Sequence, residues 1–174
     1  MPQELLDYSR GNISLQSQEV EVGRLLERII EYLREDLAAS NVVLITRFDH
    51  REPVHIDADR LRRVIINIAG NAADAMPKGG RLTISSRVVR DSWDLAATDT
   101  GTGIPEQLRP RIFEPSVTSG KEHGTGLGLA IAREIVRGHG GDIQVETRTE
   151  REEAGRPAGS TFIISLPLSG VAAE

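Results

Sequence analysis

The segment from Asp99 to Leu129 constrains this chain most strongly, because two glycine-rich motifs bracket a polar stretch within it. It reads D-T-G-T-G-I-P, then R-I-F-E-P-S-V-T-S-G-K-E-H, then G-T-G-L-G-L, and an apolar helical pattern follows directly. A long polar loop inside a compact domain is usually functional, and it is often a lid over a site. Glycines at the start of a helix expose backbone N–H groups that bind phosphate oxygens. These features predict a nucleotide site with a mobile cover.

Composition excludes several classes of function. The chain has 174 residues, a net charge of −5 and no cysteine. An acidic balance without a basic block argues against a nucleic-acid partner, and the lack of cysteine excludes disulfides and thiolate chemistry. No apolar run approaches the ~18 residues that span a bilayer. We therefore expect a cytoplasmic domain without direct membrane contact, whose parent protein could still be membrane-anchored.

Apolar periodicity predicts three long helices and at least five strands. The helices are expected over residues 22–37, over 57–75 with Asp57 as N-cap, and over 125–137. A shorter helix is expected to begin at Pro105 and to reach Ile112. Strands are expected at 42–48, 53–56, 81–89, 93–98, 142–148 and 161–166, with an edge strand within 12–22. Hairpins combined with helices predict an α+β two-layer sandwich with a mixed, mostly antiparallel sheet.

Two asparagines stand out on the second predicted helix. Asn67 and Asn71 are four residues apart, so both lie on one side of the helix. Asn disfavours helix interiors because its amide competes for backbone hydrogen bonds. The pair is either two solvated or internally bonded amides, or a site where amide oxygens meet Mg²⁺ and phosphates.

Asp99, at the end of a predicted strand, precedes Gly101 and Gly103. An Asp-Gly turn would explain this pattern, and so would a carboxylate that accepts a hydrogen bond from the amine of a nucleotide base. The Rossmann fingerprint and the Walker P-loop are both absent. Any ATP site here therefore belongs to another class.

Four motifs occur in order: N-I-A-G-N-A-A-D-A at 67–75, D-T-G-T-G-I-P at 99–105, I-F-E-P at 112–115 and G-T-G-L-G-L-A-I-A at 124–132. They resemble the N, G1, F and G2 boxes of the catalytic ATP-binding domain of sensor histidine kinases. This domain belongs to the GHKL superfamily, together with gyrase, the ninety-kilodalton heat-shock chaperone and MutL. The resemblance covers roughly residues 20–168, and the N box is most similar to that of nitrogen-regulation kinases.

The resemblance implies ATP and Mg²⁺ as ligands and assigns roles at the helix and the first glycine motif. Asn71 would coordinate Mg²⁺, and Asn67 would contact phosphate or a metal-bound water. Asp99 would bind the adenine amino group. The resemblance places Gly103 and Ile104 in the adenine pocket, which Gly101 would also shape. It also places Asp74 in the nucleotide site, although this residue could instead cap the helix or set the polarity of the site.

The lid and the second glycine motif follow by the same resemblance. Phe113 would anchor the lid, although a role as a core aromatic fits equally well. Lys121 is the cation of the lid and would reach the terminal phosphate, unless it is only a solvated loop residue; His123 receives no role. The hinge and phosphate-binding residues would be Gly124, Thr125, Gly126, Leu127, Gly128 and Leu129.

One departure from the hydrolytic members of the superfamily bears on mechanism. They carry a glutamate at the position of Asn67 as general base for water, and an amide cannot accept that proton. The resemblance therefore implies transfer of the γ-phosphoryl group to a histidine of a separate dimerisation domain, followed by a response regulator. The alternative is a nucleotide-binding module that regulates a protein partner without phosphorylating a histidine.

The acceptor histidine is not evident in this sequence, because none of its four histidines lies in an acceptor-like helical context. Residues 1–11 resemble the end of a dimerisation helix, 12–170 form the catalytic domain, and 171–174 form a tail. We expect this piece to be monomeric and its parent kinase to be a homodimer.

Overall fold

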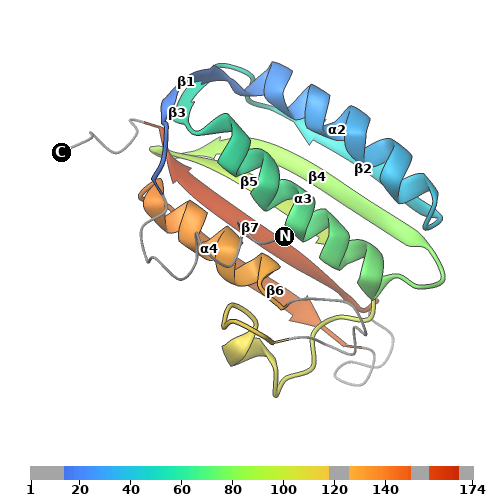
Figure 1. Cartoon of the computed structure of the whole chain (residues 1–174). Coiled ribbons are helices and arrows are strands. Elements are labelled where there is room, and N and C mark those ends of the chain that lie inside the picture. The colour runs from blue at the N-terminus through green and yellow to red at the C-terminus, as the bar shows by residue number, and fades with distance from the viewer. Residues whose placement is uncertain (1–13, 118–125, 150–156, 169–174) are drawn as a thin grey trace.

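A computed structural model describes residues 14–117, 126–149 and 157–168. Three helices cover one face of a five-stranded sheet, so the described chain forms two layers (Figure 1). A separate two-stranded sheet lies at one end. This arrangement confirms the predicted α+β sandwich.

The large sheet has the order β2-β4-β5-β7-β6. Its strands are Val42–Phe48 (β2), Gly80–Val89 (β4), Ser92–Asp99 (β5), Asp142–Arg148 (β6) and Gly159–Pro167 (β7). Only the β2–β4 pair is parallel, and the other three pairs are antiparallel. The sheet is therefore mixed and mostly antiparallel, as predicted. The β5–β7 pairing brings Asp99 opposite Ser160.

Apolar stripes on the helices face the sheet and form the core. Helix α2 (Val22–Ala38) buries residues at helical spacing, including Leu26, Ile29 and Leu33. Helix α3 (Ala58–Ala75) buries Leu61, Val64, Ile65, Ile68, Ala69 and Ala72. Because one side of α3 is committed to the core, its polar residues lie outside this apolar stripe.

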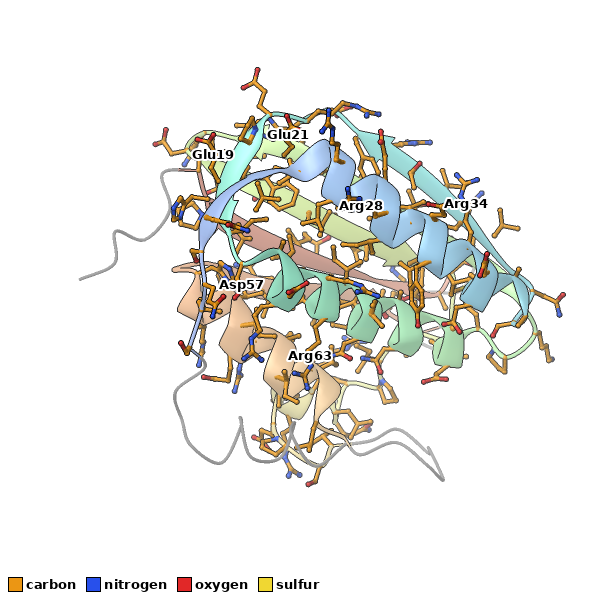
Figure 2. The ribbon with its side chains drawn as sticks, turned by 45° about the horizontal axis from the view of Figure 1, so that its top comes forward. Glu19, Glu21, Arg28, Arg34, Asp57 and Arg63 are labelled. Atoms are coloured by element: carbon orange, nitrogen blue, oxygen red, sulfur yellow. The ribbon has the colours of Figure 1, made fainter. Side chains whose placement is uncertain are left out.

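Asp57 lies at the start of α3 (Figure 2) and is its N-cap, as predicted. Its hydrogen bonds join three parts of the chain. Its Oδ1 accepts the Arg60 N–H at 3.0 Å, and its Oδ2 accepts the Gln16 N–H at 2.8 Å. Its own N–H donates to Nε2 of the buried His139 at 2.9 Å, at the end of helix α4 (Gly128–Gly138). These hydrogen bonds connect the start of α3 to the end of α4 and to the segment that precedes β1.

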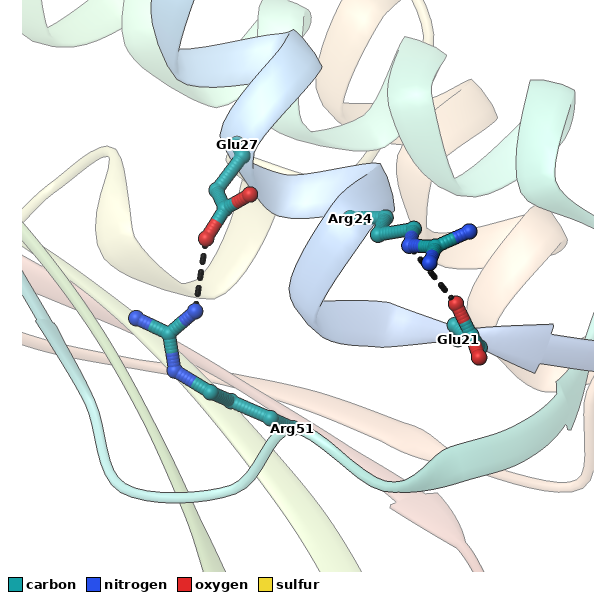
Figure 3. Close-up of polar contacts among 4 residues, drawn as sticks. All are labelled: Glu21, Arg24, Glu27 and Arg51. Carbon is teal, nitrogen blue, oxygen red and sulfur yellow. Dashed lines mark hydrogen bonds and ion pairs between the residues drawn. The ribbon is translucent and has the colours of Figure 1, made fainter.

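The predicted edge strand within 12–22 is shorter than expected and joins the small sheet. It forms only at Gln18–Glu21 (β1) and pairs antiparallel with Pro53–Ile56 (β3). The following Val22 already belongs to α2, because its side chain is fully buried with the helical stripe. Near this junction Arg51 bonds to Glu27 at 2.6 Å, and Arg24 pairs with Glu21 (Figure 3).

The predicted helix from Pro105 to Ile112 is wrong. This segment forms successive i→i+3 turns, with a 3₁₀ turn only at Arg109–Arg111. The reason is Pro110, which has no N–H to donate to the Glu106 carbonyl, so an α-helical bond cannot form there. The Leu108 N–H donates instead to the Pro105 carbonyl at 2.9 Å.

Helix α4 begins three residues later than the predicted start at residue 125. Gly126 has a φ of 67°, which is incompatible with a right-handed helix, and Leu127 is the N-cap. The prediction for residues 1–11 lies outside the described residues. Within the described part of the chain, no helix has both the length and the apolarity needed to cross a membrane.

Candidate functional site

A pocket of about 540 Å³ opens between α3, the start of α4 and the segment after β5. It brings together nine of the predicted site residues: Asn67, Asn71, Asp74, Asp99, Gly103, Ile104, Gly126, Gly128 and Leu129. The outermost of these residues, Asn67 and Leu129, are 62 positions apart in the sequence. A concave pocket with convergent polar groups is the usual form of a ligand site.

Asp99 provides a buried carboxylate at one end of the pocket. Only 5% of its surface is exposed. Its Oδ1 accepts the Gly101 N–H at 2.8 Å and the Ser160 N–H at 3.2 Å. Burial raises the pKa of the Asp99 carboxyl above its ordinary value, and the two backbone hydrogen bonds partly offset this effect. Because both donors use Oδ1, Oδ2 is the oxygen that can accept a hydrogen bond from a ligand.

Close packing requires the two glycines after Asp99. A Cβ on Gly101 would stand 2.7 Å from the Ala75 Cβ, so Gly101 lets this segment pack on the last turn of α3. Gly103 has a φ of 73°, and a Cβ there would collide with the Arg148 carbonyl. Gly101 itself does not line the pocket. The next residue, Ile104, donates its N–H to Thr147 Oγ1 at 2.8 Å.

The asparagine side of α3 forms the opposite wall. Asn67 Nδ2 donates to the Gly128 carbonyl at 3.2 Å, which links α3 to the first turn of α4 and leaves Oδ1 for a ligand. Asn71 is half-buried one turn further along, and Asp74 is exposed at the rim. The amides therefore lie on the pocket side of the helix rather than on a solvated face.

Backbone donors at the start of α4 complete this wall. The N-cap residue Leu127 makes no side-chain hydrogen bond to the first turn, so the first N–H groups have no side-chain partner at the cap. Leu127 is buried and does not line the pocket, whereas Gly126, Gly128 and Leu129 do. Uncapped N–H groups at a helix start favour an anionic ligand.

Phe113 is half-buried and packs against the core next to the pocket. Its ring meets Phe162, a pocket residue, edge-on at 6.5 Å between centroids. The Arg133 guanidinium of α4 lies 5.5 Å from the Phe113 centroid. Nearby, the Ser116 N–H donates to the Gly126 carbonyl at 3.1 Å, which joins the chain on either side of residues 118–125. The predicted site residues Lys121, Gly124 and Thr125, as well as His123, lie outside the described residues.

Several pocket residues were missed from the sequence. Gly70 could have been predicted from the sequence, because helical spacing puts it beside Asn67 and Asn71. Ser160 and Phe162 could not, because only the β5–β7 register brings them to Asp99. The remaining missed residues are mostly apolar: Ile66, Ala75, Pro77, Thr102, Pro105, Leu108, Ile112 and Val117. They give the pocket apolar walls of the kind that a planar base would need.

The donor set fits Mg²⁺ carried by a phosphate ligand rather than a metal held by protein alone. In the described part of the chain, no group of three or more His, Cys, Asp or Glu residues could hold a metal ion. The pocket instead offers the hard oxygens of Asn67, Asn71 and Asp74. Mg²⁺ typically binds through one or two protein oxygens together with substrate phosphates and water.

Comparisons with known proteins agree with this geometry. Residues 56–170 match the family model described as histidine kinase-, DNA gyrase B-, and HSP90-like ATPase. Sporulation kinase C of Bacillus subtilis is 34% identical over 150 residues, which cover 85% of this chain and 33% of that protein. Overall, the chain spans about a fifth to a third of the length of the first such relatives.

Two solved structures share the fold over nearly the whole chain. Full-length ShkA in complex with AMPPNP is 25% identical, with a TM-score of 0.81, and the match covers 98% of this chain and 36% of that one. The histidine kinase ThkA in complex with the response regulator protein TrrA is 28% identical, with a TM-score of 0.77, and the match covers 96% and 46%. The predicted family is thereby confirmed.

Proposed function

The chain belongs to the family of histidine kinase-, DNA gyrase B-, and HSP90-like ATPases, as a histidine kinase catalytic domain, and from this premise we propose a specific reaction. It binds MgATP and donates the γ-phosphoryl group to a histidine on a separate dimerisation domain. One observation carries the proposal: the buried Asp99, the paired amides of α3 and the uncapped start of α4 line a single pocket.

The Asp99 end is suited to adenine. The exocyclic amine of adenine donates hydrogen bonds, and the Asp99 Oδ2 is a charged acceptor at the bottom of the pocket. Apolar side chains such as Ile104, Ile112 and Phe162 line the same pocket and can cover the faces of the base. An analogue that lacks the amine would leave a buried carboxylate unpaired, so the site selects for adenine.

The phosphates would extend toward Asn71, Asn67 and the N–H groups at the start of α4. Mg²⁺ would be held by the Asn71 oxygen together with the phosphates, where it supplies charge neutralisation to the transferring group. Asn67 would contact phosphate or a metal-bound water through Oδ1, since its Nδ2 is held by Gly128. The resemblance of this N box to that of nitrogen-regulation kinases remains a prediction, as do the lid roles of Lys121, Gly124 and Thr125.

The amide at position 67 favours transfer over hydrolysis. A water attacking the γ-phosphorus would need a base, and Asn67 cannot accept its proton. An imidazole nitrogen attacks with its own lone pair, so the bond between the γ-phosphorus and the leaving oxygen of ADP breaks as the phosphorus–nitrogen bond forms. Positioning and charge stabilisation are then the main tasks of the protein.

We further propose the partners of this domain from its relatives. ThkA has been solved with the response regulator TrrA, which supports a response regulator as the downstream partner here. AMPPNP in the ShkA structure supports an adenine nucleotide as ligand. We expect this domain to meet ATP and the regulator in the cytoplasm, and a dimeric parent kinase to supply the acceptor helix.

Calorimetric titration with AMPPNP, with and without Mg²⁺, tests nucleotide binding. We expect magnesium-dependent binding, and its absence would refute the nucleotide site. Incubation with γ-labelled ATP and a dimerisation domain of a related kinase then tests transfer. Label on that domain, with negligible steady-state release of phosphate by the chain alone, is the expected result. Binding without any transfer would favour the partner-regulating module, and rapid hydrolysis would contradict the reading of Asn67.

A further inference from the structure

Gly70 lies in the middle of α3 and lines the pocket between Asn67 and Asn71. Glycine in a helix interior is unfavourable relative to alanine, because folding restricts its backbone more and no side chain compensates. A glycine at such a position calls for a reason, which is commonly an unusual backbone angle or close packing.

The fold supplies neither reason for Gly70. It is not among the glycines with positive φ. A Cβ built on Gly70 would meet no heavy atom of the described residues within 4 Å. Other helical glycines differ: a Cβ on Gly23 would stand 3.1 Å from the Arg51 Cβ, and one on Gly138 would stand 2.9 Å from Leu15 Cδ1. Among the glycines of the described helices, Gly70 alone faces open space.

This open space lies beside the amides and away from the adenine end. The Asp99 end of the pocket meets α3 at its last turn, where the Thr102 N–H donates to the Ala75 carbonyl at 3.1 Å. At ~1.5 Å of rise per residue, Gly70 lies about 7.5 Å back along the helix from Ala75. It shares a turn with Asn67, which contacts the first residue of α4.

We propose that Gly70 sets the room for the polyphosphate end of the nucleotide and thereby determines which ligands the pocket admits. This inference rests on the proposed function. A triphosphate carries a metal ion that keeps several bound waters. The phosphates, the metal and its waters together need more space than the atoms that the Asn67 and Asn71 amides contact directly. Bare backbone at Gly70 leaves space for that group, whereas a side chain there would occupy it.

The test uses Gly70→Ala and Gly70→Leu, with Ala73→Gly as a matched control. Ala73 lies on the same helix and does not line the pocket. Without nucleotide, we expect Gly70→Ala to raise Tm by about 2 °C through helix propensity, and the control to lower it similarly. With Mg²⁺ present, Gly70→Ala should weaken AMPPNP binding about tenfold and Gly70→Leu more, whereas the control should bind like wild type.

Adenosine is the second probe, because it lacks phosphates. Its weak binding, followed by ligand-observed magnetic resonance, should be unchanged in Gly70→Ala. Equal weakening of adenosine and AMPPNP would overturn the assignment to the phosphate end. Undiminished AMPPNP affinity in both variants would show that the ligand does not use this space, and a lower Tm for Gly70→Ala would show that the fold does need the glycine. If the wild-type chain binds no nucleotide at all, the proposed function itself would be refuted.

Discussion

Replacing Asp99 with Asn should stabilise the unliganded domain at neutral pH. Oδ1 of an asparagine can still accept the N–H groups of Gly101 and Ser160. Burial raises the pKa of Asp99 above 3.8, so the folded state binds this proton more tightly than the unfolded state. The contribution of Asp99 to stability is therefore complete below about pH 3.8 and is lost as the pH rises through the folded-state pKa. An uncharged amide avoids this loss.

The same change should weaken nucleotide binding. With Oδ1 held by the two backbone donors, the amide presents its NH₂ where Oδ2 had been, and this group cannot accept from the adenine amine. A hydrogen bond to a charged acceptor contributes about 1.5–3 kcal/mol, which corresponds to roughly 10- to 150-fold in Kd. Asp99→Asn should therefore bind AMPPNP weakly and be more stable without it.

Two assays separate these effects. Urea unfolding between pH 3 and 8 should show the stability of wild type falling below that of the variant as the pH rises, with the difference smallest at the acidic end. Calorimetry at pH 7 should show the loss of affinity. Asp94→Asn, on the other face of β5, should change neither quantity noticeably. Wild-type affinity in Asp99→Asn, or a less stable unliganded variant at pH 7, would contradict the role assigned to the Asp99 carboxylate.

Three further predictions concern residues that build the site. Asn71→Ala should abolish magnesium-dependent AMPPNP binding while the circular dichroism spectrum is retained; binding that still responds to magnesium would remove Asn71 as a metal ligand. Asp57→Ala should lower the free energy of unfolding by about 0.5–2 kcal/mol through the lost helix cap, while Asp57→Asn retains most of it; equal urea midpoints for Asp57→Ala and wild type would contradict this role. Gly103→Ala should lower both Tm and nucleotide affinity, because its φ of 73° strains a side chain that would also meet the Arg148 carbonyl; an unchanged Tm would show that the loop adapts without cost.

Local sequence signals were sufficient for features that depend on a single helix or strand. The apolar stripes of α2 and α3 follow helical spacing, and the Asp57 cap is encoded within four residues. Asn67 and Asn71 could be placed on one side of a helix for the same reason. The four motifs in order indicated the family, which the family model confirms.

Local signals failed where a neighbouring residue changed the hydrogen bonding. Pro105 is favourable at a helix start, yet Pro110 removes the donor that an α-helix would need, and 3₁₀ geometry results. Gly126 similarly shortens α4, because its positive φ lies outside the helical region. Apolar and polar residues alternate over 12–22 as in a strand, but Val22 is buried in the core as the first residue of α2, so the strand ends at Glu21.

Most helices and strands, the family and the residue types that the chemistry would require could be predicted from the sequence alone. Which of these residues line one pocket, and how burial changes their ionisation, depends on the tertiary structure. Ser160 reaches Asp99 through the β5–β7 register, a pairing that no local spacing encodes. Burial by several elements raises the pKa of Asp99, and the open space beside Gly70 depends on how the described parts of α3, α4 and the segment after β5 pack together. Periodicity is a property of neighbouring residues, whereas desolvation and empty volume depend on every segment that surrounds them.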